Sequence, residues 1–325
     1  MFANRALGFS LILSVTVVGC GPCSPDSDFS VGLEGESLLL REERLTHETA
    51  IHVEAWDAEA PPEPPDGVFE VVRYPAPLGE NLAYVSPVRD AEPGPAIVWI
   101  VGGFYFGLTQ VPWAEAPRSN DQSGRAFREA GIPMMYPSLR GSMGNPGERE
   151  CFFGEVDDVI AAVRFLATRP DVDPERVYVG GHSTGGTMAL LVAESTDEVA
   201  GVIALGPVAD PRGYGGSGCL PTDLDDGFEA KLRAPVEWVE QIRVPTVVVE
   251  GSDDGNADAL ALFEEYRGEA PVRLVEVPGL DHFSVIAPAL ELLAARVAGG
   301  QALEVSADAI RAASNVLDRE GPTRP

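Results

Sequence analysis

The residues best suited to chemistry lie in one stretch, from Arg176 to Ala193. A short apolar run over 177–179 precedes the pattern G-x-S-x-G at 181–185, and an apolar segment follows it. Between a strand and a helix, this pattern places a serine on a strained turn where glycines permit close backbone approach, and it directs the helix N-terminus at a nearby anion. The stretch predicts that Ser183 is a nucleophile. The alternative is an ordinary glycine-rich turn.

A serine hydroxyl needs a base to take its proton and a carboxylate to orient that base. Two of the four histidines, His47 and His52, precede a proline-rich run, and His182 adjoins the serine with an unfavourable backbone direction. His282 follows the last expected strand, so it can meet Ser183 where the carboxyl ends of parallel strands share one crevice. We expect His282 to be the base. The alternative is a surface histidine that begins a helix.

The acid should lie between the serine and the histidine in the chain, because this architecture uses that order. Asp254 is the first choice, since it lies far enough beyond the strand Val244 to Glu250 to turn toward the crevice. Asp253 is the second choice, and Asp210, after the preceding strand, is the third. The other aspartates of these loops are expected to be solvated turn residues.

Acyl transfer also needs donors that face the developing oxyanion. The backbone amide of Thr184 is expected to be the first, because Thr184 follows the nucleophile. The second is expected in the loop after the apolar strand Ala96 to Val101, from the amide of Gly103 or Phe104. Alternatively, the glycines of that loop only form a tight exit turn.

The remaining periodicity supplies a scaffold for these residues. Strands are expected at 69–74, 82–88, 96–101, 132–136, 177–179, 199–205, 244–250 and 272–277, and helices at 154–168, 187–193, 256–267, 282–297 and 306–319. Strands alternating with helices indicate an α/β fold with a mostly parallel sheet covered on both faces. The connection 206–243 is long and glycine-rich, and we expect it to form part of an acyl pocket or a small lid.

The chain resembles the α/β-hydrolases, and within them the branch of prolyl oligopeptidase and dienelactone hydrolase. The resemblance runs from Phe69 to Val297 and rests on the segments 138–147, 154–158, 171–176, 181–185 and 250–254. It implies an α/β-hydrolase fold with Ser183 as nucleophile, Asp254 as acid and His282 as base. Many relatives have His-Gly-Gly where this chain has Val101-Gly102-Gly103, so the oxyanion loop departs from their pattern.

Composition narrows the function further. The net charge is −28, from 51 acidic and 23 basic residues, and this field would repel phosphate backbones and anionic lipid surfaces, so no nucleic-acid partner is expected. Four histidines without H-E-x-x-H or paired-cysteine spacing predict no metal site, and no cofactor is expected. We expect a serine hydrolase of small carboxylic esters. The alternatives are a peptidase or acyl-peptide hydrolase that lacks the β-propeller of the family's peptidases, and a non-catalytic lipoprotein with a hydrolase fold.

The first residues predict export. Residues 1–19 carry one charge and an apolar run too short to span a bilayer comfortably, and they end before Cys20 as a bacterial lipoprotein signal does. The resemblance implies that Cys20 is lipidated and anchors the protein in the cell envelope; ordinary secretion is the alternative. We expect a tether and N-terminal extension over 20–67, a catalytic domain over 68–300, and a tail over 301–325 with a possible helix.

Export also implies an oxidising compartment. Cys151 and Cys219 both fall in loop-like stretches at the carboxyl side of expected strands, and we expect them to form a disulfide.

Overall fold

Eight strands form one mixed sheet in the computed structural model, which describes residues 39–54, 60–217, 219–221, 224 and 227–315. The strands are β1 (Glu70–Ala76), β2 (Gly79–Val85), β3 (Gly94–Ile100), β4 (Met134–Pro137), β5 (Val172–His182), β6 (Gly201–Leu205), β7 (Thr246–Gly251) and β8 (Val272–Val277). Their order is β1-β2-β4-β3-β5-β6-β7-β8. β1, β2 and β4 pair antiparallel, and every pair from β4 to β8 is parallel.

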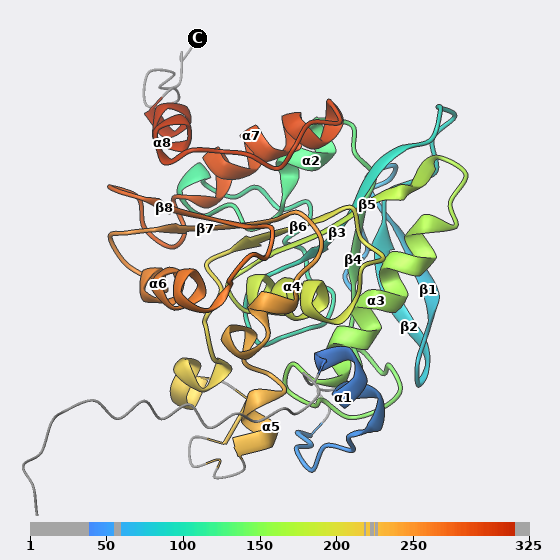
Figure 1. Cartoon of the computed structure of the whole chain (residues 1–325). Helices are drawn as coiled ribbons and strands as arrows, with labels where there is room; N and C mark the ends of the chain where they lie inside the picture. The colour runs from blue at the N-terminus through green and yellow to red at the C-terminus, as the bar shows by residue number, and fades with distance from the viewer. Residues whose placement is uncertain (1–38, 55–59, 218, 222–223, 225–226, 316–325) are drawn as a thin grey trace, which may run out of the picture. The chain divides into compact units, whose positions relative to one another are not determined.

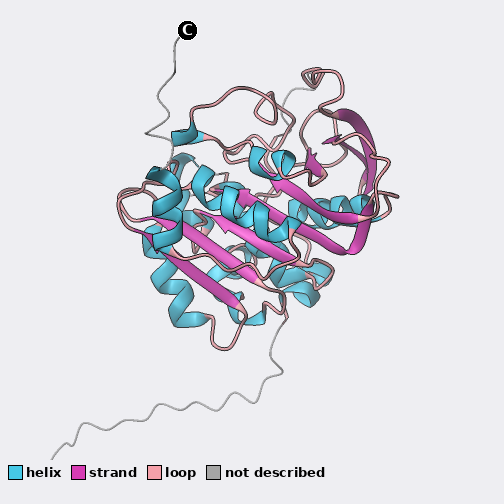
Figure 2. Ribbon diagram, turned by 90° about the horizontal axis from the view of Figure 1, so that it is seen from above, coloured by secondary structure: helices cyan, strands magenta, loops and turns pink. Residues whose placement is uncertain are grey.

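Helices cover both faces of the sheet. They are α1 (Leu40–Thr46), α2 (Arg125–Glu129), α3 (Gly154–Ala167), α4 (Thr184–Ser195), α5 (Gly227–Lys231), α6 (Ala257–Tyr266), α7 (Ile286–Ala298) and α8 (Ala307–Asn315). Figure 1 shows α3, α4 and α6 on one face and α2, α7 and α8 on the other. Figure 2, seen from above, shows the strands running between the two helical layers. The expectation of an α/β fold with a parallel sheet covered on both faces is confirmed.

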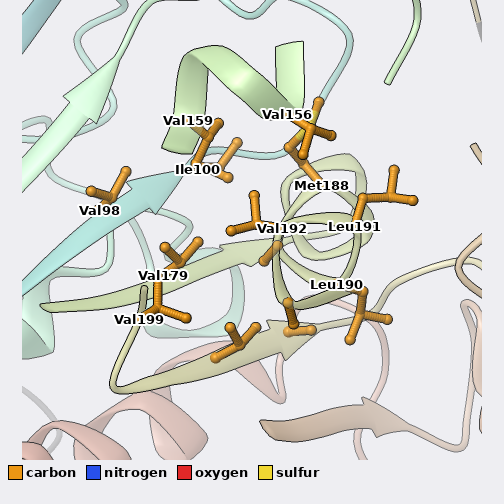
Figure 3. Packing of buried hydrophobic residues seen from close by; sticks show 14 of the residues in the cluster. Val98, Ile100, Val156, Val159, Val179, Met188, Leu190, Leu191, Val192 and Val199 are labelled. Atoms are coloured by element: carbon orange, nitrogen blue, oxygen red, sulfur yellow. The ribbon is translucent and has the colours of Figure 1, made fainter. Parts of the chain in front are cut away.

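The core is densest around α4, the helix that follows the serine. Its side chains are buried all round, because α4 packs on the sheet with one side and under α3 and α1 with the others. Figure 3 shows Val192 of α4 near Val179 of β5, and Met188 of α4 next to Val156 of α3. All four side chains are fully buried. This packing fixes the N-terminus of α4 at the carboxyl end of the central strands.

The elements follow the expected pattern with local differences. β5 begins at Val172, five residues before the expected apolar run, because Gly94 pairs with Val172 across a register shift in β3. The helix expected at 282–297 starts only at Ile286, and His282 lies in the turn before it. The short helix α2 was not expected from the periodicity, since only one of its five residues, Phe127, is buried.

Part of the N-terminal extension packs on the catalytic domain. The buried carboxylate of Glu229, in α5, accepts hydrogen bonds from Thr49 Oγ1 (2.9 Å) and the Ala50 amide (2.8 Å) and forms an ion pair with Arg233. Burial raises the pKa of Glu229, but its hydrogen bonds, including one with His47, outweigh that effect and bring the pKa to about 2. Residues 47–50 therefore form one polar network with the β6–β7 connection, residues 206–243.

The expected signal peptide and Cys20 lie outside the described residues, as do residues 316–319 of the expected tail helix. Within the described ranges, no helix is long and apolar enough to cross a membrane. The described residues all belong to a single compact unit.

Candidate active site

Ser183 occupies a strained turn between β5 and α4. Its backbone has φ 57° and ψ −118°, and its amide donates to the Leu205 carbonyl of β6 at 2.7 Å. A non-glycine residue with positive φ carries a steric cost, which is met where surrounding contacts fix it. A Cβ on Gly185 would lie 2.1 Å from the Ile100 carbonyl oxygen, so a side chain there would push the turn off β3. The sequence at this turn therefore holds Ser183 at the tip of the sheet.

His282 lies in the turn between β8 and α7, with its ring beside Glu250. His282 Nδ1 is 2.8 Å from Glu250 Oε2, and the His282 amide donates to the Asp254 carbonyl at 3.0 Å. Nε2 of His182 contacts the carbonyl of His282 at 3.0 Å and acts as the donor there, because a carbonyl only accepts. Burial, and secondarily the nearby His282, lower the pKa of His182 to about 3, so His182 stays neutral. His182 thus braces the backbone of His282.

Ser183 and His282 flank the same short piece of chain after β6. The Ser183 amide is bonded to Leu205, and the next residue is Gly206, with φ +58°. A Cβ on Gly206 would lie 2.5 Å from Cε1 of His282 and 2.8 Å from Oε2 of Glu250. The backbone at Gly206 therefore lies against the imidazole, and a side chain there would displace it. With Nδ1 engaged by the carboxylate, Nε2 is the imidazole nitrogen left to act as base.

The carboxylate at His282 is that of Glu250, not of the expected Asp254. Glu250 is the penultimate residue of β7 and fully buried; its Oε1 accepts from the Gly251 amide (2.7 Å) and its Oε2 from the Asn256 amide (3.2 Å). Asp254 is exposed and meets His282 only through its backbone carbonyl. The longer glutamate side chain reaches the imidazole directly from the strand, so no carboxylate from the following loop is needed.

The two other aspartates considered for this role are engaged elsewhere. Asp253 is exposed, and its Oδ1 accepts from the Gly279 amide and Ser252 Oγ. The carboxylate of Asp210 pairs with Arg212. Both are turn residues, as their solvated loop positions would suggest.

The expected oxyanion residues lie on two adjacent segments. Thr184 is the first residue of α4, where a helix has amides without intrahelical partners. Its Oγ1 donates to the Gly103 carbonyl at 2.6 Å, and Arg149 donates to the Phe104 carbonyl at 3.2 Å. Gly103 has φ +95°, and a Cβ there would meet nothing within 4 Å. The Thr184 bond ties the β3 exit loop to the start of α4, and the Arg149 bond holds the same loop from the segment before α3.

Aromatic rings from three segments gather next to Ser183. Tyr214, in the β6–β7 connection, packs edge-to-face on Phe104 at 5.2 Å and lies parallel to Phe152 at 6.0 Å between ring centroids. Cys151, next to Phe152, is joined to Cys219 by a disulfide with a Cα–Cα distance of 5.7 Å. The β6–β7 connection thus contributes a wall near the serine.

No cluster of three or more histidine, cysteine, aspartate or glutamate side chains suited to a metal ion exists within the described part of the chain. What the site offers is a serine, an imidazole with a buried carboxylate partner, and a helix N-terminus. This set is suited to nucleophilic acyl transfer.

Comparison with known proteins agrees with this set. The model of the prolyl oligopeptidase family matches residues 124–285, which include Ser183, Glu250 and His282. The uncharacterized peptidase YtmA of Bacillus subtilis (strain 168) is 27% identical over a region that covers 40% of this chain and 55% of that protein. The chain has the α/β-hydrolase fold, and its residues 124–285 resemble the prolyl oligopeptidase family. It spans about half of the length of the curated relative that it matches.

Solved structures of a puromycin hydrolase, a peptidase and an esterase share this fold. A puromycin hydrolase has TM-score 0.56 and 22% identity, over 71% of this chain and 39% of that chain. The acylaminoacyl peptidase of Pyrococcus horikoshii has TM-score 0.58 and 14% identity, over 75% and 44%. The esterase of Pyrobaculum calidifontis has TM-score 0.53 and 20% identity, over 73% and 87%. At these identities the likeness concerns the fold.

Two residues of this site were not predicted from the sequence. Glu250 follows the apolar run Val247–Val249 near the carboxyl end of β7, and a carboxylate at the end of a buried apolar run was the available signal. Tyr214 lies in the glycine-rich stretch 213–218, which resembles a turn and carries no periodic signal.

Proposed function

We propose that this chain is a serine hydrolase that cleaves short peptides or aminoacyl amides with the triad Ser183, His282 and Glu250. One observation carries the proposal: the 2.8 Å contact between His282 Nδ1 and the buried Glu250 carboxylate, formed beside a serine on a strained strand-to-helix turn. An imidazole held through Nδ1 presents Nε2 as base. Support for an amide substrate comes from the prolyl oligopeptidase family match and from the peptidase homologue.

The proposed reaction has two halves. Ser183 Oγ attacks the substrate carbonyl carbon while its proton passes to His282 Nε2, and the carbonyl oxygen becomes an oxyanion. The amides of Thr184 and of Gly103 or Phe104 are the candidate donors to that oxyanion. Collapse breaks the bond to the leaving amine or alcohol, which takes the proton from His282. A water then attacks the acyl-serine by the same route and releases a carboxylic acid and free Ser183.

Covalent labelling tests the nucleophile. A fluorophosphonate probe should label the protein through Ser183, and Ser183→Ala should abolish that labelling. A parent protein that the probe leaves unmodified under conditions where it is folded would end the hydrolase proposal.

Paired substrates test the leaving group. We expect a larger rate enhancement, meaning kcat/KM divided by the uncatalysed rate constant, for aminoacyl arylamides than for p-nitrophenyl esters. The esterase of Pyrobaculum calidifontis, covered over 87% of its length, makes esters the second candidate class. Turnover of esters with none of the amides would assign the chain to that class.

We also propose that the protein is exported and lipidated at Cys20. The proposal rests on the sequence of residues 1–20, and the Cys151–Cys219 disulfide is compatible with an oxidising compartment. Labelling of producing cells with a fatty-acid analogue should mark the protein, and Cys20→Ser should remove the mark. A mark that survives this substitution would contradict lipidation at Cys20.

A further inference from the structure

The phenol of Tyr214 lies beside the nucleophile. Its oxygen is 2.8 Å from Thr187 Oγ1, one turn into α4. The Ser183 side chain lies close enough to this oxygen to influence the pKa of Tyr214. Burial raises the pKa of Tyr214 well above its ordinary value, and this effect outweighs the influence of the neighbouring Thr187 and Ser183 hydroxyls. The phenol therefore keeps its proton at neutral pH and has a proton to donate.

The hydrogen bonds around Thr187 decide where the phenol proton points. Thr187 Oγ1 accepts from the Val208 amide at 3.1 Å. Its own proton can go to the Ser183 carbonyl at 3.3 Å, which already accepts from the Thr187 amide, or to the Tyr214 oxygen at 2.8 Å. The shorter contact to the phenol is the better hydrogen bond. When Thr187 donates to Tyr214, the phenol proton is left for Ser183.

The ring of Tyr214 is held in place by packing. Phe104 contacts it edge-on and Phe152 lies parallel to it. The disulfide between Cys151 and Cys219 joins the two segments that carry Phe152 and Tyr214. A donor whose position is fixed before the reaction needs little reorganisation when charge develops.

We propose that Tyr214 is a catalytic residue, whose hydroxyl donates a hydrogen bond to Ser183 Oγ and stabilises the negative charge on that oxygen as bonds to it form and break. The proposal rests on the proposed serine hydrolase function. Ser183 Oγ gives its proton to His282 Nε2 during attack, and it leaves as an alkoxide-like oxygen when the acyl-serine breaks down. A neutral donor at this oxygen favours both steps, while the Tyr214 proton itself stays on the phenol.

The substitution Tyr214→Phe removes the hydroxyl and keeps the ring. A hydrogen bond to a charged group contributes about 1.5–3 kcal/mol, so kcat should fall about 10- to 100-fold. We expect KM to change little, and the second-order rate of labelling by a small fluorophosphonate to fall by a similar factor. Tyr266→Phe, on the exposed face of α6, is the control and should leave both rates unchanged.

The outcomes separate this role from a structural one. If Tyr214 only shapes the acyl pocket, Tyr214→Phe will alter KM for large substrates and leave the labelling rate of a small probe unchanged, which would overturn the proposal. Because labelling of Ser183 in the parent protein is measured first, this result would leave the hydrolase function standing. Should Tyr214→Phe not fold, a ring-fluorinated tyrosine at 214 gives a stronger donor of similar size, and an unchanged labelling rate would then overturn the proposal.

Discussion

The carboxylate of Glu250 lies 2.8 Å from Nδ1 of His282, although the two residues come from different strand ends. Two backbone amides, of Gly251 and Asn256, also bind this carboxylate. Glu250 is therefore held from its own strand end and from the start of α6 before any substrate binds. A carboxylate fixed in this way selects one imidazole tautomer, with the proton on Nδ1.

Glu250→Gln should lower kcat by about 1,000-fold or more, because an amide in place of the carboxylate favours the wrong tautomer of the base. The variant keeps nearly the same shape, so its thermal unfolding should change little compared with its activity. The measurement is kcat for an aminoacyl arylamide.

Asp254→Asn is the matched comparison. Since Asp254 is exposed and contacts His282 through its backbone, we expect kcat within a factor of about two of the parent. A large loss in Asp254→Asn together with a small one in Glu250→Gln would return the role of acid to Asp254.

The fold could be predicted because its signals are local. Continuous apolar runs such as Val247–Val249, bounded by Pro245 and Gly251, specify buried parallel strands whatever the rest of the chain does. The G-x-S-x-G turn was similarly visible, since Gly185 leaves no room for a side chain against Ile100.

The residues that contact Ser183 and His282 were harder to predict. Each contact depends on how far a side chain or a loop extends across the edge of the sheet. Spacing favoured Asp254, whereas the length of the Glu250 side chain decides the contact with His282. Tyr214 meets Ser183 only because the β6–β7 connection folds back over α4, and no periodicity encodes that path. The cysteine pair at 151 and 219 could be named because both follow strands, and the structure joins them.

Removing the disulfide should cost stability and activity together. Cys151 and Cys219 are 68 positions apart, and closing a loop of that size stabilises a fold by about 2–4 kcal/mol. We expect the double substitution Cys151→Ala and Cys219→Ala to lower the free energy of unfolding by this amount and to lower kcat, because Tyr214 loses its anchor. Urea unfolding and arylamide turnover measure the two effects. Full activity in a destabilised variant would show that the disulfide does not position Tyr214 for the reaction.

His182 should make the protein sensitive to mild acid. Its pKa is about 3 in the folded state and about 6.5 in an unfolded chain, so between these values only the unfolded chain binds the proton. The free energy of unfolding is not reduced by this residue above pH 6.5. Below that pH it falls, by about 2 kcal/mol between pH 6.5 and pH 5, because the unfolded chain binds a proton at His182. His182→Gln should remove this slope in urea unfolding. His52→Gln, at an exposed histidine, is the control, and equal slopes in parent and His182→Gln would refute the assignment.

Glu194 on α4 should destabilise the fold at neutral and alkaline pH. Both its carboxylate oxygens are buried and have no hydrogen-bond partner in the described part of the chain. Burial raises its pKa well above the usual range, and the charge of Arg44 offsets only part of this. Above the ordinary glutamate pKa of about 4.3, the unfolded chain gains stability by ionising, so the cost to the folded state grows as the pH rises.

Glu194→Leu should therefore raise the free energy of unfolding by about 1–3 kcal/mol at pH 8, since an apolar side chain of similar size needs no partner. This increase in the free energy of unfolding should be smaller at pH 4.5. At that pH the parent glutamate is protonated in the folded state, and in the unfolded chain it is less ionised than at pH 8. Arg44 keeps its bond to the Phe153 carbonyl and its ion pair with Asp157 in the variant. Urea unfolding at the two pH values measures the difference, with Glu265→Gln on the exposed face of α6 as the control. A variant less stable than the parent at pH 8 would show that the pair of Arg44 and Glu194 holds α1 on α4.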